Sequence, residues 1–173
     1  MKRFLSVVLF SAVLAAWVGA QNQTPRPSPA DQARLVQRNR ALYRTAVDRG
    51  LNLTKQYDAL DRAGTCTELA KDWAKEVEAA AKARDHVRVA ELGKQLSQVV
   101  DQGVVANLEE ARKKIEAGSL REKALEKRRD DAVDVLKPLL DDALRGVTEY
   151  EAVRKAVAAG VDKIQSAAKV EKP

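Results

Sequence analysis

The chain has 173 residues, of which 45% are hydrophobic and 32% charged, and its formal net charge is +6. This mixture is too apolar for a wholly disordered protein and is typical of a helical domain. One Cys and one His exclude a structural zinc site of four such ligands and a framework of internal disulfides. The sequence also lacks the C-x-x-C-H motif of haem attachment and the Glu-x-x-His pair of di-iron bundles. We therefore expect no metal and no cofactor.

Residues 1–20 have the pattern of a secretory signal peptide. Lys2 and Arg3 form a positive start, residues 4–18 are an apolar stretch, and Gly19 and Ala20 are small residues before a plausible cleavage site. We expect a periplasmic or secreted protein, and export argues against nucleic acid as a partner. The alternative is an uncleaved anchor, although the apolar run is short for a spanning helix of ~20 residues. Membrane contact is expected only in that case.

Proline divides the rest of the chain. Three alternating prolines lie within residues 21–29, which favours extended geometry, and we expect residues 21–28 to be a disordered segment. Residues 36–137 contain no proline and so lack the strongest helix breaker. No stretch shows the two-residue alternation of a strand. The sequence predicts one helical domain over residues 29–168, followed by a frayed tail at 169–173.

Glycine followed by a helix-capping sequence marks three predicted junctions. In each sequence a Ser or Thr stands three residues before a Glu, so that the hydroxyl and the carboxylate can cap two orphan backbone N–H groups. Glycine is the favoured residue just past a helix end. The glycines are Gly64, Gly118 and Gly146, and the capping sequences begin at Thr65, Ser119 and Thr148.

The junctions predict five helices, each with apolar residues at helical spacing along one side. Asp85 is a credible N-cap for the third helix, although a single bent helix over the second and third is the alternative. Pro138 should kink or split the fourth helix. Because short junctions place consecutive helices side by side in opposite directions, we predict an all-α, up-and-down antiparallel bundle of about five helices. Their predicted ranges are 29–63, 66–83, 86–117, 120–145 and 149–168.

Cys66 is the first candidate functional residue. It directly follows the predicted cap at Thr65, and a helix N-terminus lowers the pKa of a thiol. The single His, His86, lies 20 residues later, about 30 Å along a straight helix at 1.5 Å per residue, so we predict no Cys–His dyad. A solvated polar residue is the plainer interpretation of His86. For Cys66 three interpretations stay open: an idle buried thiol, a disulfide between two copies of the chain in a homodimer, and a reactive site.

Five arginines in the first predicted helix are the second candidate. They flank its apolar stripe, where their stems can cover the edge of the core. The alternative is an arginine-rich binding strip. Arg34, Arg38 and Arg49 lie on one side of the stripe, and Arg40 and Arg44 lie on the other.

These patterns favour an exported, non-enzymatic helical protein that binds envelope or extracellular macromolecules, with a protein as its partner. Long charged amphipathic helices offer large surfaces for protein partners. A chaperone-like holder of unfolded exported proteins is the first alternative, and it requires an exposed apolar surface with a basic rim. A thiol-dependent redox protein or enzyme that uses Cys66 is the second alternative.

Overall fold

A computed structural model of the chain describes residues 29–169. The predicted signal peptide, the proline-rich segment 21–28 and the tail beyond residue 169 lie outside this range. The chain divides into two units, residues 1–39 and 40–173, and the boundary falls within the first described helix. The packing and the candidate sites described below belong to residues 40–169.

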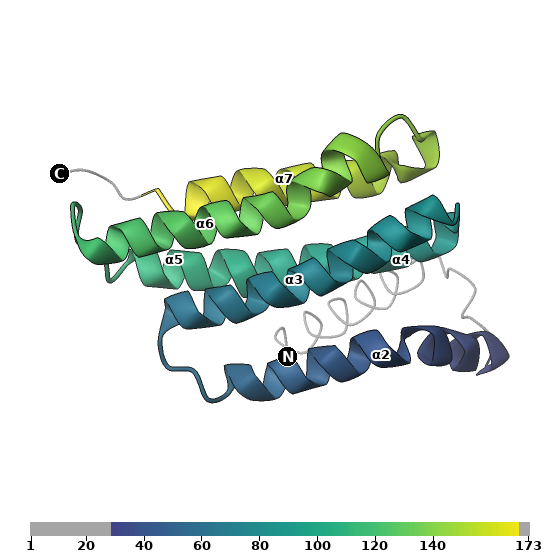
Figure 1. The fold of residues 1–173 in the computed structure, drawn as a ribbon, viewed down its shortest axis with the longest axis horizontal. Coiled ribbons are helices and arrows are strands. Elements are labelled where there is room, and N and C mark those ends of the chain that lie inside the picture. The colour runs from purple at the N-terminus through teal and green to yellow at the C-terminus, as the bar shows by residue number, and fades with distance from the viewer. Residues whose placement is uncertain (1–28, 170–173) are drawn as a thin grey trace, which may run out of the picture. The chain divides into compact units, whose positions relative to one another are not determined.

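The described residues form helices and turns without a strand between residues 29 and 169, which confirms the all-α prediction. None of the helices in this range is long and apolar enough to span a membrane. Two π-helical segments, η2 and η3, continue α4 and α6 directly. Figure 1 shows the arrangement of the labelled helices. The elements are α2 (Pro29–Leu53), α3 (Ala59–Lys82), α4 (His86–Gln98), η2 (Val99–Val105), α5 (Ala106–Arg112), α6 (Leu120–Pro138), η3 (Leu139–Ala143), the 3-10 turn η4 (Thr148–Tyr150) and α7 (Glu151–Ala167).

The first predicted helix boundary is wrong. The sequence predicts a helix over residues 29–63, but α2 ends at Leu53 and α3 begins at Ala59. Asp58 is the true N-cap, because its carboxylate accepts a hydrogen bond of 2.8 Å from the Leu60 backbone N–H. Gly64 lies inside α3, and the Thr65 hydroxyl donates to the Gln56 side chain at 3.1 Å instead of capping a helix.

The turn between α3 and α4 forms where it was predicted. Arg84 has a φ of 55°, and Asp85 accepts a hydrogen bond of 3.1 Å from the Arg88 backbone N–H. The two rods on either side of it are therefore separate helices, not one bent helix.

The later junctions are confirmed in part. Gly118 has a φ of 80°, and Ser119 after it accepts a hydrogen bond of 3.2 Å from the Glu122 N–H. Gly146 has a φ of 72°, but the turn that follows at Thr148 has no side-chain cap. Pro138 does not split the fourth helix: it ends α6, and the chain continues directly into η3.

Helices α3, α4–η2–α5, α6 and α7 make up the bundle. Successive helices run in opposite directions, as predicted. Two pairs of neighbouring helices are nevertheless parallel: α3 with α6, and α4 with α7 (Figure 1). Asp58 and Arg121, at the beginnings of α3 and α6, form an ion pair. Asp101 of η2 and Lys163 of α7 pair at 2.8 Å. The two ion pairs thus join α3 to α6 and η2 to α7.

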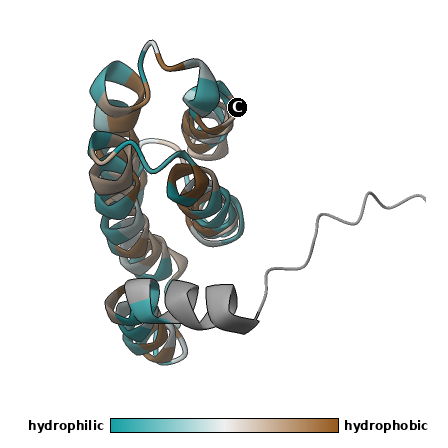
Figure 2. Cartoon of the chain, turned by 90° about the vertical axis from the view of Figure 1, so that its right-hand side faces the viewer, coloured by the Kyte–Doolittle hydropathy of each residue, from teal (hydrophilic) through white to brown (hydrophobic). Residues whose placement is uncertain are grey.

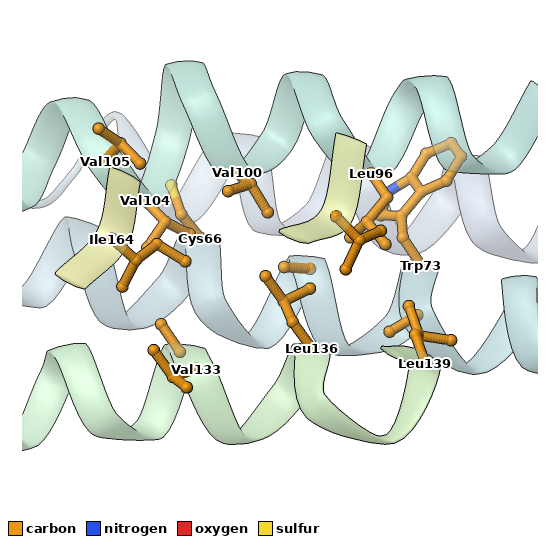
Figure 3. Packing of buried hydrophobic residues seen from close by; sticks show 14 of the residues in the cluster. Cys66, Trp73, Leu96, Val100, Val104, Val105, Val133, Leu136, Leu139 and Ile164 are labelled. Carbon is orange, nitrogen blue, oxygen red and sulfur yellow. The ribbon is translucent and has the colours of Figure 1, made fainter. Parts of the chain in front are cut away.

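The hydrophobic core runs along the inside of this bundle (Figure 3). Hydrophobic and hydrophilic residues occupy different sides of the helices (Figure 2). Residues 40–53 of α2 meet α3 from outside: the Tyr43 and Trp73 rings make an edge-on contact with centroids 6.2 Å apart, and Arg49 pairs with Asp72 at 2.9 Å. The largest fully buried side chains include Tyr150, Leu92, Leu96, Leu108, Leu125, Leu136, Leu139, Leu144 and Ile164.

Candidate functional site

An exposed apolar stripe on α2 is the main candidate binding surface. Tyr43, Val47 and Leu51 follow one another at four-residue intervals and therefore share one side of the helix. Their exposed fractions are 44%, 61% and 58%. Within residues 40–169 only three other large hydrophobic side chains are exposed, and each stands alone at a helix end or in a loop: Tyr57, Val87 and Leu120.

Two arginines complete this surface. Arg40 and Arg44 are exposed, and they precede Tyr43 and Val47 by three residues, a spacing that makes them neighbours on a helix. We call these five residues, Arg40, Tyr43, Arg44, Val47 and Leu51, the α2 face. It contains no acidic residue, and Asp48 lies beside it, next to Arg44 along the helix. The α2 face is thus both apolar and positively charged.

The structure divides the predicted arginine strip. Arg40 and Arg44 lie on the α2 face. Arg49 turns toward α3, where its Nε donates to Asp72 at 3.0 Å and the side chain is half-buried. The side chains of Arg34 and Arg38 lie outside the described part of the chain. Only two of the five arginines are therefore placed together on an exposed surface.

Cys66 is not at a helix start, because α3 begins seven residues earlier at Ala59. Its side chain is 4% exposed and lies among the buried hydrophobic residues (Figure 3). Burial raises the pKa of the Cys66 thiol, and the nearby positive charge of Arg62 opposes this rise less strongly. A low thiol pKa was the premise of the reactive-site interpretation, and the structure removes that premise. The intermolecular disulfide stays a prediction, and it would require α3 to move and expose the sulfur.

Polar groups close around the thiol. Asn107 Nδ2 lies 4.0 Å from Cys66 Sγ and donates to the Gly103 carbonyl at 2.7 Å. Asn107 Oδ1 accepts from Arg62 Nε at 2.7 Å, and Arg62 also pairs with Glu110. This network holds the Arg62 guanidinium on Asn107 and Glu110.

His86 lies elsewhere. It is the first residue of α4 and is exposed, and its ring packs on Tyr150 with centroids 5.2 Å apart. The structure does not bring Cys66 and His86 together. Residues 29–169 also contain no group of three or more His, Cys, Asp or Glu side chains arranged to hold a metal ion.

A groove between α3 and α6 is a second candidate, and no pattern in the sequence predicts it. Its volume is about 550 Å³. Arg128 of α6 lies over Gly64 of α3 at one end of it. Gly64 was interpreted as a helix terminator, so its role as a seat for an arginine was missed.

No protein-family model, curated protein or solved structure matches this chain.

Proposed function

We propose that this chain is an exported, non-enzymatic helical-bundle protein that binds another protein through the α2 face. The signal-peptide pattern of residues 1–20 supports export. The observation that carries the binding proposal is the stripe of Tyr43, Val47 and Leu51, more than two-fifths exposed at each position. Exposed apolar side chains gathered on one element mark interaction surfaces more often than scattered ones do.

The charge of the α2 face defines the chemistry of the partner. Arg40 and Arg44 add two positive charges without an acid between them. The complementary surface is an amphipathic segment that carries apolar side chains flanked by Asp or Glu. Such a segment buries the stripe and pairs with both guanidinium groups, which form strong, directional bonds with carboxylates.

The size of the face sets the expected strength of binding. Full burial of one large apolar side chain contributes about 1.5–3 kcal/mol, and roughly half of each side chain in the stripe is still exposed. The three residues together therefore contribute about 2–4 kcal/mol, and exposed ion pairs add about 0–1 kcal/mol each. A dissociation constant of 1 μM corresponds to about −8.2 kcal/mol, so this face by itself supports transient binding.

The thiol supports a non-enzymatic role. The raised pKa and burial of Cys66 are typical of an inert structural cysteine, since reactive cysteines have low pKa values and partial exposure.

The test is cross-linking of the mature chain in its own compartment. The cross-linked partners of the wild type are compared with those of two variants. The first carries Tyr43→Ser, Val47→Ser and Leu51→Ser. The control carries Val87→Ser and Leu120→Ser, at positions 71% and 83% exposed, and loses apolar surface elsewhere. We expect one dominant protein, cross-linked by the wild type and the control but not by the triple variant. Equal yields from the wild type and the triple variant would refute the role of the α2 face.

The chaperone-like holder is the second candidate, and the same stripe favours it because its arginines form a basic rim. A holder should delay the aggregation of several unrelated unfolded proteins, whereas a dedicated binding protein should not. Light scattering of a reduced, aggregating client protein separates the two. The holder is favoured if the wild type and the control variant delay aggregation of the client protein and the triple variant does not.

A further inference from the structure

The groove between α3 and α6 lies between two parallel helices that run side by side (Figure 1). Ala74, Val135 and Leu139 contribute apolar atoms to its lining. Charged residues of both helices line its edges. Every lining residue belongs to α3, α6 or η3, so the groove is separate from the α2 face. Its lining residues are Gly64, Thr67, Glu68, Lys71, Ala74, Lys75, Glu78, Arg128, Asp131, Asp134, Val135, Pro138 and Leu139.

Arg128 is seated on the backbone of α3. A Cβ atom at Gly64 would stand 3.0 Å from both Cζ and Nη1 of Arg128 and 3.3 Å from its Nη2. Glycine within a helix is unfavourable because it loses the most backbone freedom on folding. Here the missing side chain leaves the space that the guanidinium occupies. Arg128, a half-buried residue, thereby places its guanidinium against α3 at one end of the groove.

Most acidic residues of the groove form exposed ion pairs with lysines outside it. Three of the four carboxylates pair with lysines of their own helices that do not line the groove. Glu78 pairs with Lys82 at 2.6 Å, Asp131 with Lys127 at 2.8 Å and Asp134 with Lys137 at 3.8 Å.

The basic residues of the groove have no such partners. Across residues 29–169, Arg128, Lys71 and Lys75 form no ion pair with a carboxylate. Glu68, the fourth carboxylate, also pairs with none of them in that range. Three cations and four carboxylates thus line the groove, and the most buried of the cations, Arg128, forms no hydrogen bond or ion pair within the part of the chain that the structure describes.

We propose that this groove binds an oxyanion, a carboxylate or a phosphate group, on Arg128. The planar guanidinium presents two parallel N–H donors that match either group. Lys71 lies seven residues after Gly64, two turns along the same side of α3, and adds a second positive charge. The apolar lining toward Leu139 accommodates the uncharged part of the ligand.

The probes are inorganic phosphate and an acetylated, amidated peptide with one glutamate among alanines. Each is titrated into the mature protein at constant ionic strength, and the backbone amide of Gly64 and the side-chain Nε–H of Arg128 are followed by NMR. We expect saturable shifts at both positions with at least one probe. If only phosphate gives saturable shifts, the ligand of the groove is a free anion. If only the peptide does, the ligand is an acidic segment of a polypeptide.

Arg128→Gln tests the assignment, with Arg145→Gln as the matched control. Arg145 is an exposed arginine outside the groove. We expect Arg128→Gln to weaken binding about tenfold or more, since it removes a charge-assisted bidentate contact, and Arg145→Gln to change it less than about twofold. Equal affinities of the two variants, or no saturable shift with either probe, would overturn the proposal.

Gly64→Ala is a second variant that tests the anion site, and it remains informative if Arg128→Gln does not fold. The new Cβ would stand 3.0 Å from Cζ and Nη1 of Arg128, so the guanidinium must shift by a few tenths of an ångström away from α3, and alanine favours the helix. We expect a folded protein with a clear loss of anion affinity. Unchanged affinity in a folded Gly64→Ala protein contradicts the seated guanidinium as the receptor.

Discussion

Gly93→Ala tests how closely the parallel helices α4 and α7 approach each other. Gly93 is buried in α4. A Cβ atom there would stand 2.4 Å from Val153 Cγ1 and 2.9 Å from its Cγ2, far inside the optimum of about 3.5–4.0 Å for two carbon atoms. Val153 is itself buried in α7. Either its rotamer or the spacing of the two helices must change to admit one methyl group.

The expected loss of stability follows from two opposing effects. Overpacking of a core costs about 1–3 kcal/mol, and a contact as short as this one favours the upper part of that range. Alanine gains about 1 kcal/mol over glycine in a helix interior. We therefore expect the free energy of unfolding to fall by about 1–2 kcal/mol, which lowers the Tm by several degrees.

Gly50→Ala is the matched control, because a Cβ at Gly50 of α2 meets nothing within 4 Å. It should stabilise the protein by up to about 1 kcal/mol. Val153→Ala removes the clashing methyl groups, so the double variant Gly93→Ala, Val153→Ala should be at least as stable as Val153→Ala alone. Urea unfolding followed by circular dichroism measures all four proteins. If Gly93→Ala stabilises the protein as much as Gly50→Ala does, the close approach of α4 and α7 is refuted.

Two predictions concern titratable groups. Burial raises the pKa of Cys66, so the unfolded chain loses the thiol proton at a lower pH than the folded chain. The free energy of unfolding should therefore fall above the ordinary thiol pKa, more steeply in the wild type than in Cys66→Ala. Urea unfolding at several pH values measures both slopes, and equal slopes would contradict this. Hydrogen bonds from Arg121 and from the Leu60 N–H lower the pKa of Asp58, so its carboxylate stabilises the fold above the ordinary Asp pKa and this stabilisation is lost as the pH falls through the lowered value. Asp58→Ala should therefore cost about 1 kcal/mol at neutral pH and less in acid, and an equal cost at both pH values would argue against the cap.

The local signals that worked are those whose hydrogen bonds close within a few residues. Ser119 and Glu122 form the predicted cap, and the Asp85 carboxylate accepts from the Arg88 N–H. Such contacts need only groups a few residues apart, so the sequence can predict them wherever packing leaves the helix end in place. The helical spacing of apolar residues likewise predicted the all-α fold.

The same kind of signal failed at Gly64, and the reason is tertiary. Gly64 and the Thr65 sequence have every local mark of a helix end, yet α3 runs through them. The free energy there comes from contacts between distant residues: the Arg128 guanidinium lies on Gly64, and Gln56 takes the Thr65 hydroxyl. No local pattern carries information about a side chain 64 positions away.

The candidate sites divide in the same way. The sequence by itself determined the fold class, because the helical spacing of apolar residues is a short-range pattern, and its prediction of export likewise depends on a short-range pattern. It could not rank Arg40 and Arg44 above Arg49, which faces Asp72, nor tell that Cys66 is buried. Only the tertiary structure decided which side of α2 is exposed and which helices are parallel neighbours, because burial and close approach are properties of the packed bundle and not of any one helix.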